Sequence, residues 1–365
     1  MSKELKPLTG VRAFAAWGVF LYHFAPGMKT LFPSLRALDW IVGQGDKGVD
    51  LFFILSGFVL AYNYADKMRA FGILKYRNFL VMRLARIYPV HLFALGVWGA
   101  FAVMNIFMHH SQPAPGFFGL KMLLANLLLV HGWWVPLPWS WNYPAWSISM
   151  EWLAYLLFPF LVLILLRVRS TGWAVAMICG LSLTAPLFSA APYYHFVQIL
   201  SEFTSGMLLC MLYRRGFASR YNWEIISLIS LVLAVFLVHW VHAFIFPVFV
   251  VFLYSLAIGR GIVSRALGSS LANFWGRASY SLYMMHAAVL SALHVLLPPQ
   301  RFATSGFVVR AAVLMLYPIV AAATASITYW FIEEPGRRKI RELARQTRQA
   351  SPELTTPVSV TVSDD

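Results

Sequence analysis

Apolar runs of about 20 residues recur along nearly the whole chain, and no other feature limits the possible folds so strongly. An α-helix needs about 20 predominantly apolar residues to cross the hydrocarbon core of a bilayer. Of the 365 residues, 60% are hydrophobic and only 12% are charged, whereas about 25% are charged in an average soluble domain. Because a backbone in lipid must satisfy its hydrogen bonds internally, these runs predict an all-α, polytopic membrane protein.

Ten of the runs are long enough to be membrane spans, and we expect them to form one helical bundle. They cover residues 8–27, 47–65, 87–107, 147–166, 173–190, 193–213, 224–241, 243–259, 278–297 and 307–331. A further apolar stretch, residues 118–131, suits an interfacial or re-entrant segment better than a crossing because of its shortness. We therefore expect a membrane domain over residues 1–336 and a basic, then disordered, cytoplasmic tail over residues 337–365.

The charges between the runs predict the orientation in the membrane. The net charge is +15, and Lys and Arg fall in short clusters between apolar runs, as they do in cytoplasmic loops. If residues 118–131 do not cross, all the larger basic clusters lie on the side of the N-terminus, namely those in 67–86, 167–169, 214–215, 260–265 and 337–341. The positive-inside rule then predicts ten spans with both termini cytoplasmic. No basic stripe with interleaved aromatic residues lies on a polar segment, so we expect no nucleic-acid partner.

Ionisable residues inside the apolar runs are costly and therefore indicate function. They are Arg12, His23, Asp50, His91, Glu151, Glu202 and His286. If the crossings alternate, His23, Asp50 and Glu151 lie at similar depth in the outer half of the membrane. A histidine between carboxylates is suited to act as a general base, so we predict a catalytic cluster of these three residues. The alternative is that they are polar contacts between packed helices. Glu202 fits either a structural hydrogen bond or the lining of the site.

Basic residues at the cytoplasmic side form a second candidate site. Arg83 and Arg86 lie three residues apart at a helix entrance, so they face the same way and can fork onto phosphate oxygens. Tyr88 follows them directly. Arg12 lies near the cytoplasmic face, about 16 Å from His23 along a helix axis. The alternative for the arginine pair is ordinary positive-inside charge.

Polar residues at helical spacing extend the candidate site. Ser279, Tyr283 and His286 line one face of a predicted helix, and that face must look into the bundle. Ser147 lies four residues before Glu151 and therefore on the same face of its helix. We predict that Ser147, Tyr283 and His286 contact the substrate.

A cluster of tryptophans ends at Trp141, within residues 109–146, a long segment expected on the outer side of the membrane. It is either an aromatic belt at the level of the headgroups or a platform on which sugar rings stack. The sequence has no GxSxG elbow, Walker loop or HExxH motif. The two cysteines, Cys179 and Cys210, lie inside apolar runs, so we expect neither a disulfide framework nor a metal site.

Five motifs occur in order along the chain. They are Arg12 with His23; Gly48–Phe58; Arg83-x-x-Arg86-Ile87-Tyr88-Pro89; Trp146–Glu151 with Phe158-Pro159; and Ser279–Tyr283 with His286, ahead of Glu334-Pro335. This pattern resembles the acyltransferase family 3 membrane proteins, and the resemblance covers about residues 8–336.

The resemblance implies transfer of an acyl group, usually acetyl from acetyl-CoA, to a hydroxyl of a glycan, a lipid-linked sugar or another small acceptor. It makes His23 the catalytic histidine, accompanied by Arg12, with Arg83 and Arg86 as contacts for acetyl-CoA. It also implies a multi-pass protein of a bacterial inner membrane, with membrane lipid and the polysaccharide biosynthesis machinery as partners. Many relatives carry an extra extracytoplasmic domain that this sequence does not show, which favours direct transfer within the membrane domain.

We therefore expect acetyl-CoA to bind from the cytoplasm, and His23, supported by Asp50 or Glu151, to take the acceptor's proton. The oxyanion would be stabilised by Tyr283, Ser147 or His286. Direct transfer is favoured over a covalent intermediate on Ser56. Two other classes stay open: a transporter or proton-coupled carrier, although we find no internal repeat, and a structural role in polysaccharide export.

Overall fold

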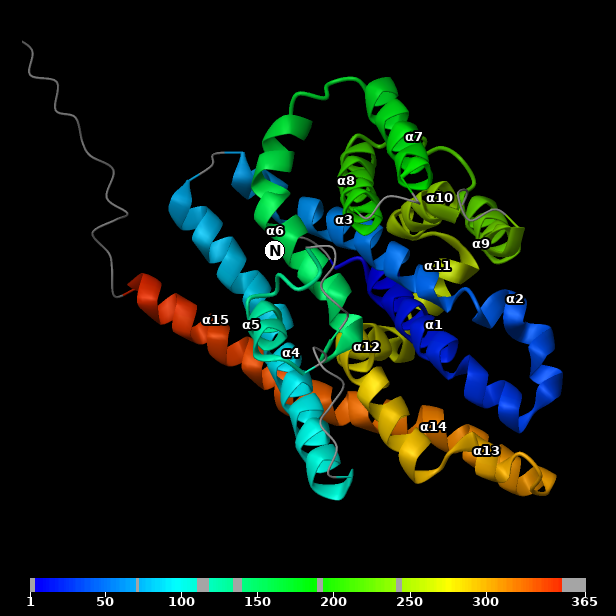
Figure 1. Cartoon of the computed structure of the whole chain (residues 1–365). Coiled ribbons are helices and arrows are strands. Elements are labelled where there is room, and N and C mark those ends of the chain that lie inside the picture. The colour runs from blue at the N-terminus through cyan, green and yellow to red at the C-terminus, as the bar shows by residue number, and fades with distance from the viewer. Residues whose placement is uncertain are drawn as a thin grey trace, which may run out of the picture.

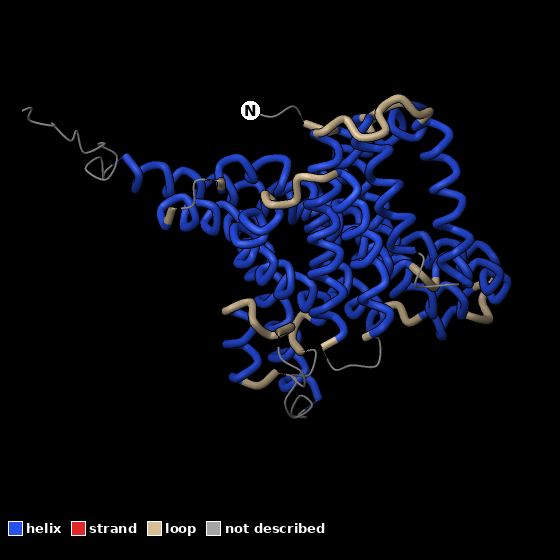
Figure 2. The backbone as a smooth tube through the Cα atoms, turned by 90° about the horizontal axis from the view of Figure 1, so that it is seen from above, coloured by secondary structure: helices blue, strands red, loops and turns tan. Residues whose placement is uncertain are grey.

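The structure, a computed structural model, describes residues 4–69, 72–109, 118–133, 140–188, 193–240 and 245–349. Throughout this part of the chain the regular elements are helices, and no strand occurs among them (Figures 1 and 2). The α-helices are α1 (Lys6–Leu31), α2 (Asp39–Val42), α3 (Gly48–Met68), α4 (Ile73–His109), α5 (Leu120–Leu127), α6 (Trp146–Leu165), α7 (Thr171–Leu187), α8 (Tyr194–Arg214), α9 (Trp223–Trp240), α10 (Ile245–Ile258), α11 (Gly261–Leu267), α12 (Ser270–Leu296), α13 (Pro299–Phe302), α14 (Phe307–Thr328) and α15 (Glu334–Gln349).

Each of the ten predicted spans coincides with most of one helix: α1, α3, α4, α6, α7, α8, α9, α10, α12 and α14. Five helices of the described chain, α3, α4, α6, α8 and α14, are long and apolar enough to cross a membrane, and a sixth span results if α10 and α11, which meet at 81°, count as one. This is the composition of a multi-pass membrane protein. Helix α5, in the short apolar stretch, has eight residues and a length of about 12 Å, which is too short to cross. The count of ten crossings stays a prediction.

Helices α1 and α12 pack against each other more extensively than any other pair of described helices. Every residue of α12 from Ala278 to Leu290 is buried. A helix that its neighbours enclose on all sides can carry polar groups without exposing them to lipid. The prediction that Ser279, Tyr283 and His286 face the interior of the bundle is thus confirmed.

Glycines let two pairs of helices come close enough for their backbones to touch. A Cβ atom on Gly57 of α3 would lie 1.9 Å from the carbonyl oxygen of Phe203 in α8, and one on Gly206 of α8 would lie 1.9 Å from a carbonyl oxygen of α3. A Cβ atom on Gly276 of α12 would lie 2.0 Å from the Thr9 carbonyl oxygen in α1. Small residues at such crossings are typical of membrane helix packing. These crossings position the helices that carry most of the candidate site.

The contacts also show which helices run in the same direction. Helices α3 and α8 are parallel, because Asp50 near the start of α3 contacts Gln198, and Asp66 near its end contacts Arg214. Helices α1 and α12 are parallel in the same way. In the predicted order these pairs are spans two and six, and spans one and nine, which alternating crossings also make parallel. The side of the membrane on which the termini lie stays a prediction.

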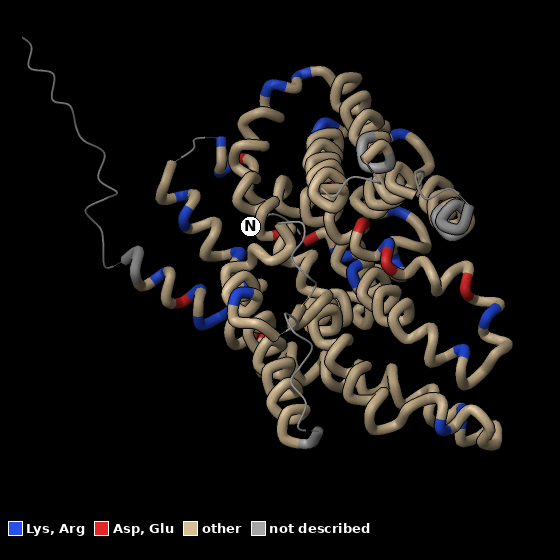
Figure 3. Tube along the Cα trace, in the orientation of Figure 1, with Lys and Arg blue, Asp and Glu red and all other residues tan. Residues whose placement is uncertain are grey.

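The C-terminal helix α15 carries the basic segment expected at the start of the tail, and it packs on α4 (Figure 1). Gly336 makes a close approach to α4 there, since a Cβ atom on it would lie 2.7 Å from the Pro89 side chain. Lys and Arg residues lie along α15 and near the ends of other helices, whereas the middles of the long helices are mostly uncharged (Figure 3). Residues 350–365, most of the stretch expected to be disordered, lie outside the described residues.

Candidate active site

A cavity of about 650 Å³ lies between α3, α4, α6 and α12. Residues of α3 from Val49 to Lys67 contribute to its wall, which corresponds to about 27 Å along the helix axis. The end of the cavity near Lys67 is lined by arginines of α4, α8 and α15, and the opposite end by Ser147 and Tyr283. We call the latter the hydroxyl end.

The basic end of the cavity consists of Lys67, Arg83, Arg86 and Arg341. Arg83 is buried, and its Nη2 donates to the Tyr64 hydroxyl at 2.8 Å. The Tyr64 ring also lies 4.9 Å from the Arg83 guanidinium and 5.3 Å from the Lys67 ammonium. In the described part of the chain, none of these four cations forms an ion pair with a carboxylate. Cations left unpaired in a cavity attract an anionic ligand.

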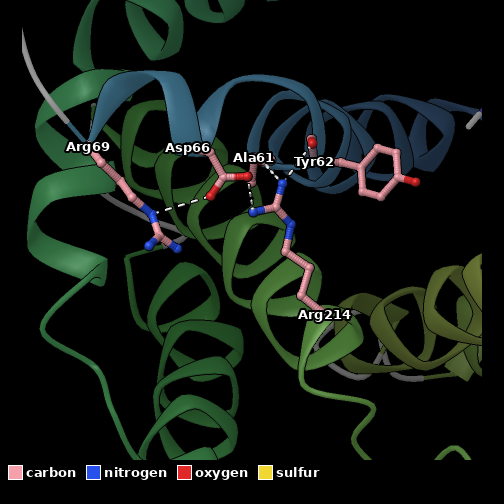
Figure 4. A network of polar contacts seen from close by, with 5 residues as sticks. All are labelled: Ala61, Tyr62, Asp66, Arg69 and Arg214. Atoms are coloured by element: carbon pink, nitrogen blue, oxygen red, sulfur yellow. Dashed lines mark hydrogen bonds and ion pairs between the residues drawn. The ribbon is translucent and has the colours of Figure 1, made fainter. Parts of the chain in front are cut away.

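Arg214 also lines the cavity, but its charge is compensated. Its Nη1 lies 2.8 Å from Asp66 Oδ2, and its Nη2 donates to the backbone carbonyls of Tyr62 at 2.8 Å and Ala61 at 3.3 Å (Figure 4). Asp66 forms a second ion pair, at 3.3 Å, with Arg69. This network ties the end of α3 to α8. Asp66 is therefore occupied by Arg214 and Arg69, and in the described chain it pairs with neither Arg12 nor the four cations of the basic end. The carboxylates nearer to Arg12 are Glu151 and Glu333.

In the middle of the cavity, Arg12 of α1 and Glu151 of α6 lie on its wall. The Arg12 guanidinium is 5.9 Å from the centroid of the Phe52 ring. Glu151 Oε1 accepts a hydrogen bond from the Ser56 hydroxyl at 2.9 Å and another from the Tyr155 hydroxyl. Two hydroxyls from two helices thus hold the Glu151 carboxylate in the cavity wall.

At the hydroxyl end, the Tyr283 hydroxyl lies 2.7 Å from Ser147 Oγ. Both hydroxyls are also within hydrogen-bond distance of the Pro144 carbonyl oxygen, at 3.0 Å and 3.2 Å. His286 lies one helical turn further along α12, and its ring centroid is 5.7 Å from that of Tyr283. Tyr283 therefore has the cavity on one side and a histidine on the other.

Beyond the hydroxyl end, His23 of α1 and His286 of α12 form a pair with ring centroids 5.0 Å apart. His23 Nδ1 lies 2.9 Å from the Val19 carbonyl oxygen. Because a carbonyl only accepts, Nδ1 of the neutral ring carries the proton and Nε2 is free to accept one. His286 Nδ1 donates in the same way to the Tyr283 carbonyl, and its Nε2 is buried without a hydrogen-bond partner. The Tyr143 ring flanks His23 at 5.5 Å.

Asp50 does not line the cavity and contacts α8 instead. The Gln198 side-chain amide donates to Asp50 Oδ1 at 2.9 Å and to Glu202 Oε1 at 3.1 Å, and both carboxylates are buried. Glu202 therefore belongs to a hydrogen-bond network between α3 and α8 and not to the cavity wall. Among the described residues, no hydrogen bond joins His23 to Asp50 or Glu151. The three predicted catalytic residues thus lie in three separate sets of contacts.

Two other predicted site residues have packing contacts and do not line the cavity. Tyr88 donates its hydroxyl to a carbonyl of α5 at 2.9 Å. Trp141 packs edge-on against Phe118 with ring centroids 5.2 Å apart. The indole of Trp133 donates to a carbonyl of α6 at 2.7 Å. Residues 134–139, the rest of the predicted tryptophan platform, lie outside the described residues.

Glu333 is a buried acid that reasoning from the sequence missed. It is 0% exposed, it accepts a hydrogen bond from the Ser281 hydroxyl at 2.6 Å, and Arg86 is the cation that acts on it most strongly. The signal was present in the sequence, as an acidic residue directly after the last apolar run. The sequence likewise indicates Arg341 only as part of a basic stretch, whereas the residue lines the cavity. No group of three metal-ligating side chains occurs in the described chain.

The family model of the acyltransferase domain matches residues 6–333 of this chain. The acyltransferase MdmB of Streptomyces mycarofaciens is 34% identical over 195 residues, which cover 51% of this chain and 47% of that protein. A putative O-acetyltransferase of Staphylococcus aureus (strain COL) and the O-acetyltransferase OatA of S. aureus (strain NCTC 8325) are each 22% identical, over 91% and 92% of this chain and 57% and 58% of their own lengths. No solved structure matches the chain.

These matches confirm the family that the five motifs indicated. The chain covers about half to three fifths of the length of these relatives, whose names describe acyl transfer and O-acetyl transfer. The family match, by contrast, covers nearly the whole chain and includes the cavity from Arg12 to Tyr283 as well as the histidine pair. The chain belongs to the acyltransferase family 3.

Proposed function

We propose that this chain transfers an acetyl group from cytoplasmic acetyl-CoA to a hydroxyl of a cell-surface or lipid-linked glycan, at a bacterial inner membrane, with His23 as the general base. The observation that carries the proposal is the series of groups along the cavity. Unpaired cations lie at one end, two hydroxyls lie at the other, and the His23–His286 pair follows directly. The relatives named for acyl and O-acetyl transfer support the class of reaction.

The cavity suits a donor that is charged at one end and carries a thioester at the other. Arg83 and Arg86 lie one turn apart on α4, where both can bind the diphosphate of coenzyme A. About 27 Å of cavity wall along α3 leaves room for an extended arm. The acetyl group then reaches Ser147 and Tyr283, next to the histidines. Arg12 lies midway along this path, with Glu151 as the acid in the same wall.

The geometry supports direct transfer. His23 Nε2 accepts the proton of the acceptor hydroxyl as the hydroxyl oxygen attacks the thioester carbonyl. The Tyr283 hydroxyl turns from the Pro144 carbonyl to the oxyanion that forms, and Ser147 supports it. The carbon–sulfur bond then breaks, and the proton passes from His23 to the departing thiolate. The products are the acetyl ester and free coenzyme A.

The surroundings of His23 support a sugar as the acceptor. His23 is half-buried, and its ring contacts Tyr22 at 5.0 Å and Tyr143 at 5.5 Å between centroids. Tyr22 is 37% exposed, so an aromatic surface reaches from the outside to the base. Tyrosine rings combine an apolar face with a polar tip, as a sugar does. We expect the acceptor to come from the polysaccharide biosynthesis machinery.

The test uses purified protein in nanodiscs, incubated with acetyl-CoA and a panel of candidate glycans, with release of free coenzyme A as the readout. His23→Ala should lower glycan-dependent release by about 10²–10⁴-fold, the usual contribution of a general base. His294→Ala is the matched control, because His294 makes the same Nδ1 contact with a backbone carbonyl, 2.7 Å away in α12, and packs against Tyr317 and not in the His23–His286 pair. Arg83→Gln combined with Arg86→Gln should abolish acetyl-CoA binding.

Release that depends on one glycan and on His23 supports the enzyme and identifies its acceptor. A folded His23→Ala protein with unchanged turnover would rule out His23 as the base. If acetyl-CoA neither binds nor turns over with any glycan, the transporter hypothesis replaces this one.

A further inference from the structure

Arg341 brings a charge into the cavity from a helix outside the family match. The match ends at residue 333, and Arg341 lies on α15, yet it lines the same cavity as Arg83 and Arg86. Arg341 is half-buried, and its Nε is buried without a hydrogen-bond partner. A guanidinium held in this way has donors available for a ligand.

The packing of α15 against α4 explains this position. Gly336 lies against Pro89, and five residues later Arg341 is within electrostatic range of Arg83, Arg86 and Tyr64. Helix α15 therefore runs back along α4 toward the basic end, in the direction opposite to that of α4. Arg341 joins the group of cations around the Tyr64 ring.

The basic end holds more unpaired charge than a diphosphate requires. It has four cations, three arginines and Lys67. Asp66 is already shared by Arg214 and Arg69, and the buried Glu333 near Arg86 offsets one of the four charges. Placing like charges together is costly unless an anion compensates them. A nucleotide with a diphosphate and a separate phosphate monoester supplies that compensation, because the monoester alone carries about −1.5 to −2 near pH 7. Coenzyme A is such a nucleotide.

We propose that Arg341, together with Lys67, binds the 3′-phosphate on the ribose of coenzyme A, while Arg83 and Arg86 bind the diphosphate. The proposal rests on the proposed function for the identity of the donor. The 3′-phosphate is then the feature by which this protein selects its donor. Thioesters of complete coenzyme A bind better than thioesters without a phosphate monoester. Examples of the latter are 3′-dephospho-coenzyme A and the pantetheine arm of a carrier protein.

The experiment compares acetyl-CoA with acetyl-3′-dephospho-CoA as donors for the full chain in nanodiscs, by KM, kcat and equilibrium binding. The wild type should prefer acetyl-CoA by about tenfold or more in KM, the amount expected for one charge-assisted contact. Arg341→Gln should remove most of this preference by weakening acetyl-CoA alone, with kcat unchanged. Arg341→Lys should restore part of it. The control is Arg338→Gln on the same helix, since Arg338 is 67% exposed and does not line the cavity.

Equal KM values for the two donors in the wild type would overturn the 3′-phosphate site while leaving the acyltransferase intact. An Arg341→Gln protein that weakens both donors equally would overturn it too, because a general loss indicates packing and not phosphate recognition. If the wild type uses neither donor, the proposed function itself fails, and the assignment of Arg341 fails with it.

Discussion

Replacing Gly57 with alanine should force α3 and α8 apart. The new Cβ atom would lie 1.9 Å from the Phe203 carbonyl oxygen, whereas Cβ contacts in proteins are essentially never shorter than 3.0 Å. Going from 1.9 to 3.0 Å, the two helices must separate by about 1.1 Å. No side chain can relieve the contact by changing its rotamer, because the obstructing atom belongs to the backbone.

The expected loss of stability follows from this geometry. Overpacking a close contact costs about 1–3 kcal/mol, and a rigid backbone contact places Gly57→Ala at the upper end of that range. The better helix propensity of alanine offsets at most about 1 kcal/mol. A net loss of about 2 kcal/mol should lower the thermal unfolding midpoint in detergent by on the order of 5 °C. Acetyl-CoA binding should weaken as well, because α3 forms one wall of the cavity from Val49 to Lys67.

Gly96→Ala is the matched control for this measurement. Gly96 lies in α4, and a Cβ atom added there would meet no atom within 4 Å. This variant should be neutral or more stable by up to about 1 kcal/mol. A Gly57→Ala protein as stable as Gly96→Ala would show that α3 and α8 do not touch through their backbones, and the argument for the crossing would fail.

Tyr283→Phe should lower kcat for acetyl transfer by about 10²–10³-fold with little change in KM for acetyl-CoA, since it removes the proposed oxyanion donor and keeps the ring; equal changes in both constants would contradict this. Gln198→Leu should lower the free energy of unfolding by on the order of 2–3 kcal/mol, because two buried carboxylates lose the donor that they share. Asn142→Ala should lower the free energy of unfolding by about 2 kcal/mol in the same denaturation assay. The Asn142 amide links α4 to α12, because its oxygen accepts from the Trp98 indole at 3.1 Å and its nitrogen donates to the Met284 carbonyl at 3.0 Å. An unchanged unfolding midpoint would argue against that link.

The helices and the candidate residues were predictable because a membrane limits both. Lipid requires long apolar helices, so the ten runs coincide with ten helices of the structure. The cost of polar groups in lipid likewise indicates that Ser279, Tyr283 and His286 must face inward, as they do. The pairing of His23 with His286 follows from two parallel helices, but only the packing of α1 against α12 shows it.

For the charged residues, neither the level along the helix nor the rotation about the helix axis could be predicted reliably from the sequence. Counting residues predicts one level for His23, Asp50 and Glu151, yet Glu151 lies in the middle of the cavity with Arg12, eleven residues before His23 on α1. Asp50 contacts α8, while its neighbours Val49 and Phe53 line the cavity. The rotation of α3 is set by where its glycine meets the α8 backbone, 146 positions away in the sequence at Phe203. A contact of this kind depends on two distant segments at once, and the pattern within either segment does not reveal it.

One cation of the basic end lies outside the region that the family model matches, and this can separate the choice of donor from the chemistry at the histidine pair. The histidine pair lies where α1 and α12 pack together, inside the matched region. The basic end is completed by Arg341 of α15, a helix that follows a π-helical segment, Tyr329–Glu333, and packs on α4. A π-turn contains more residues than an α-turn, so it changes the facing of every residue that follows it. Changes in α15 should therefore alter the choice of donor without altering the chemistry at His23.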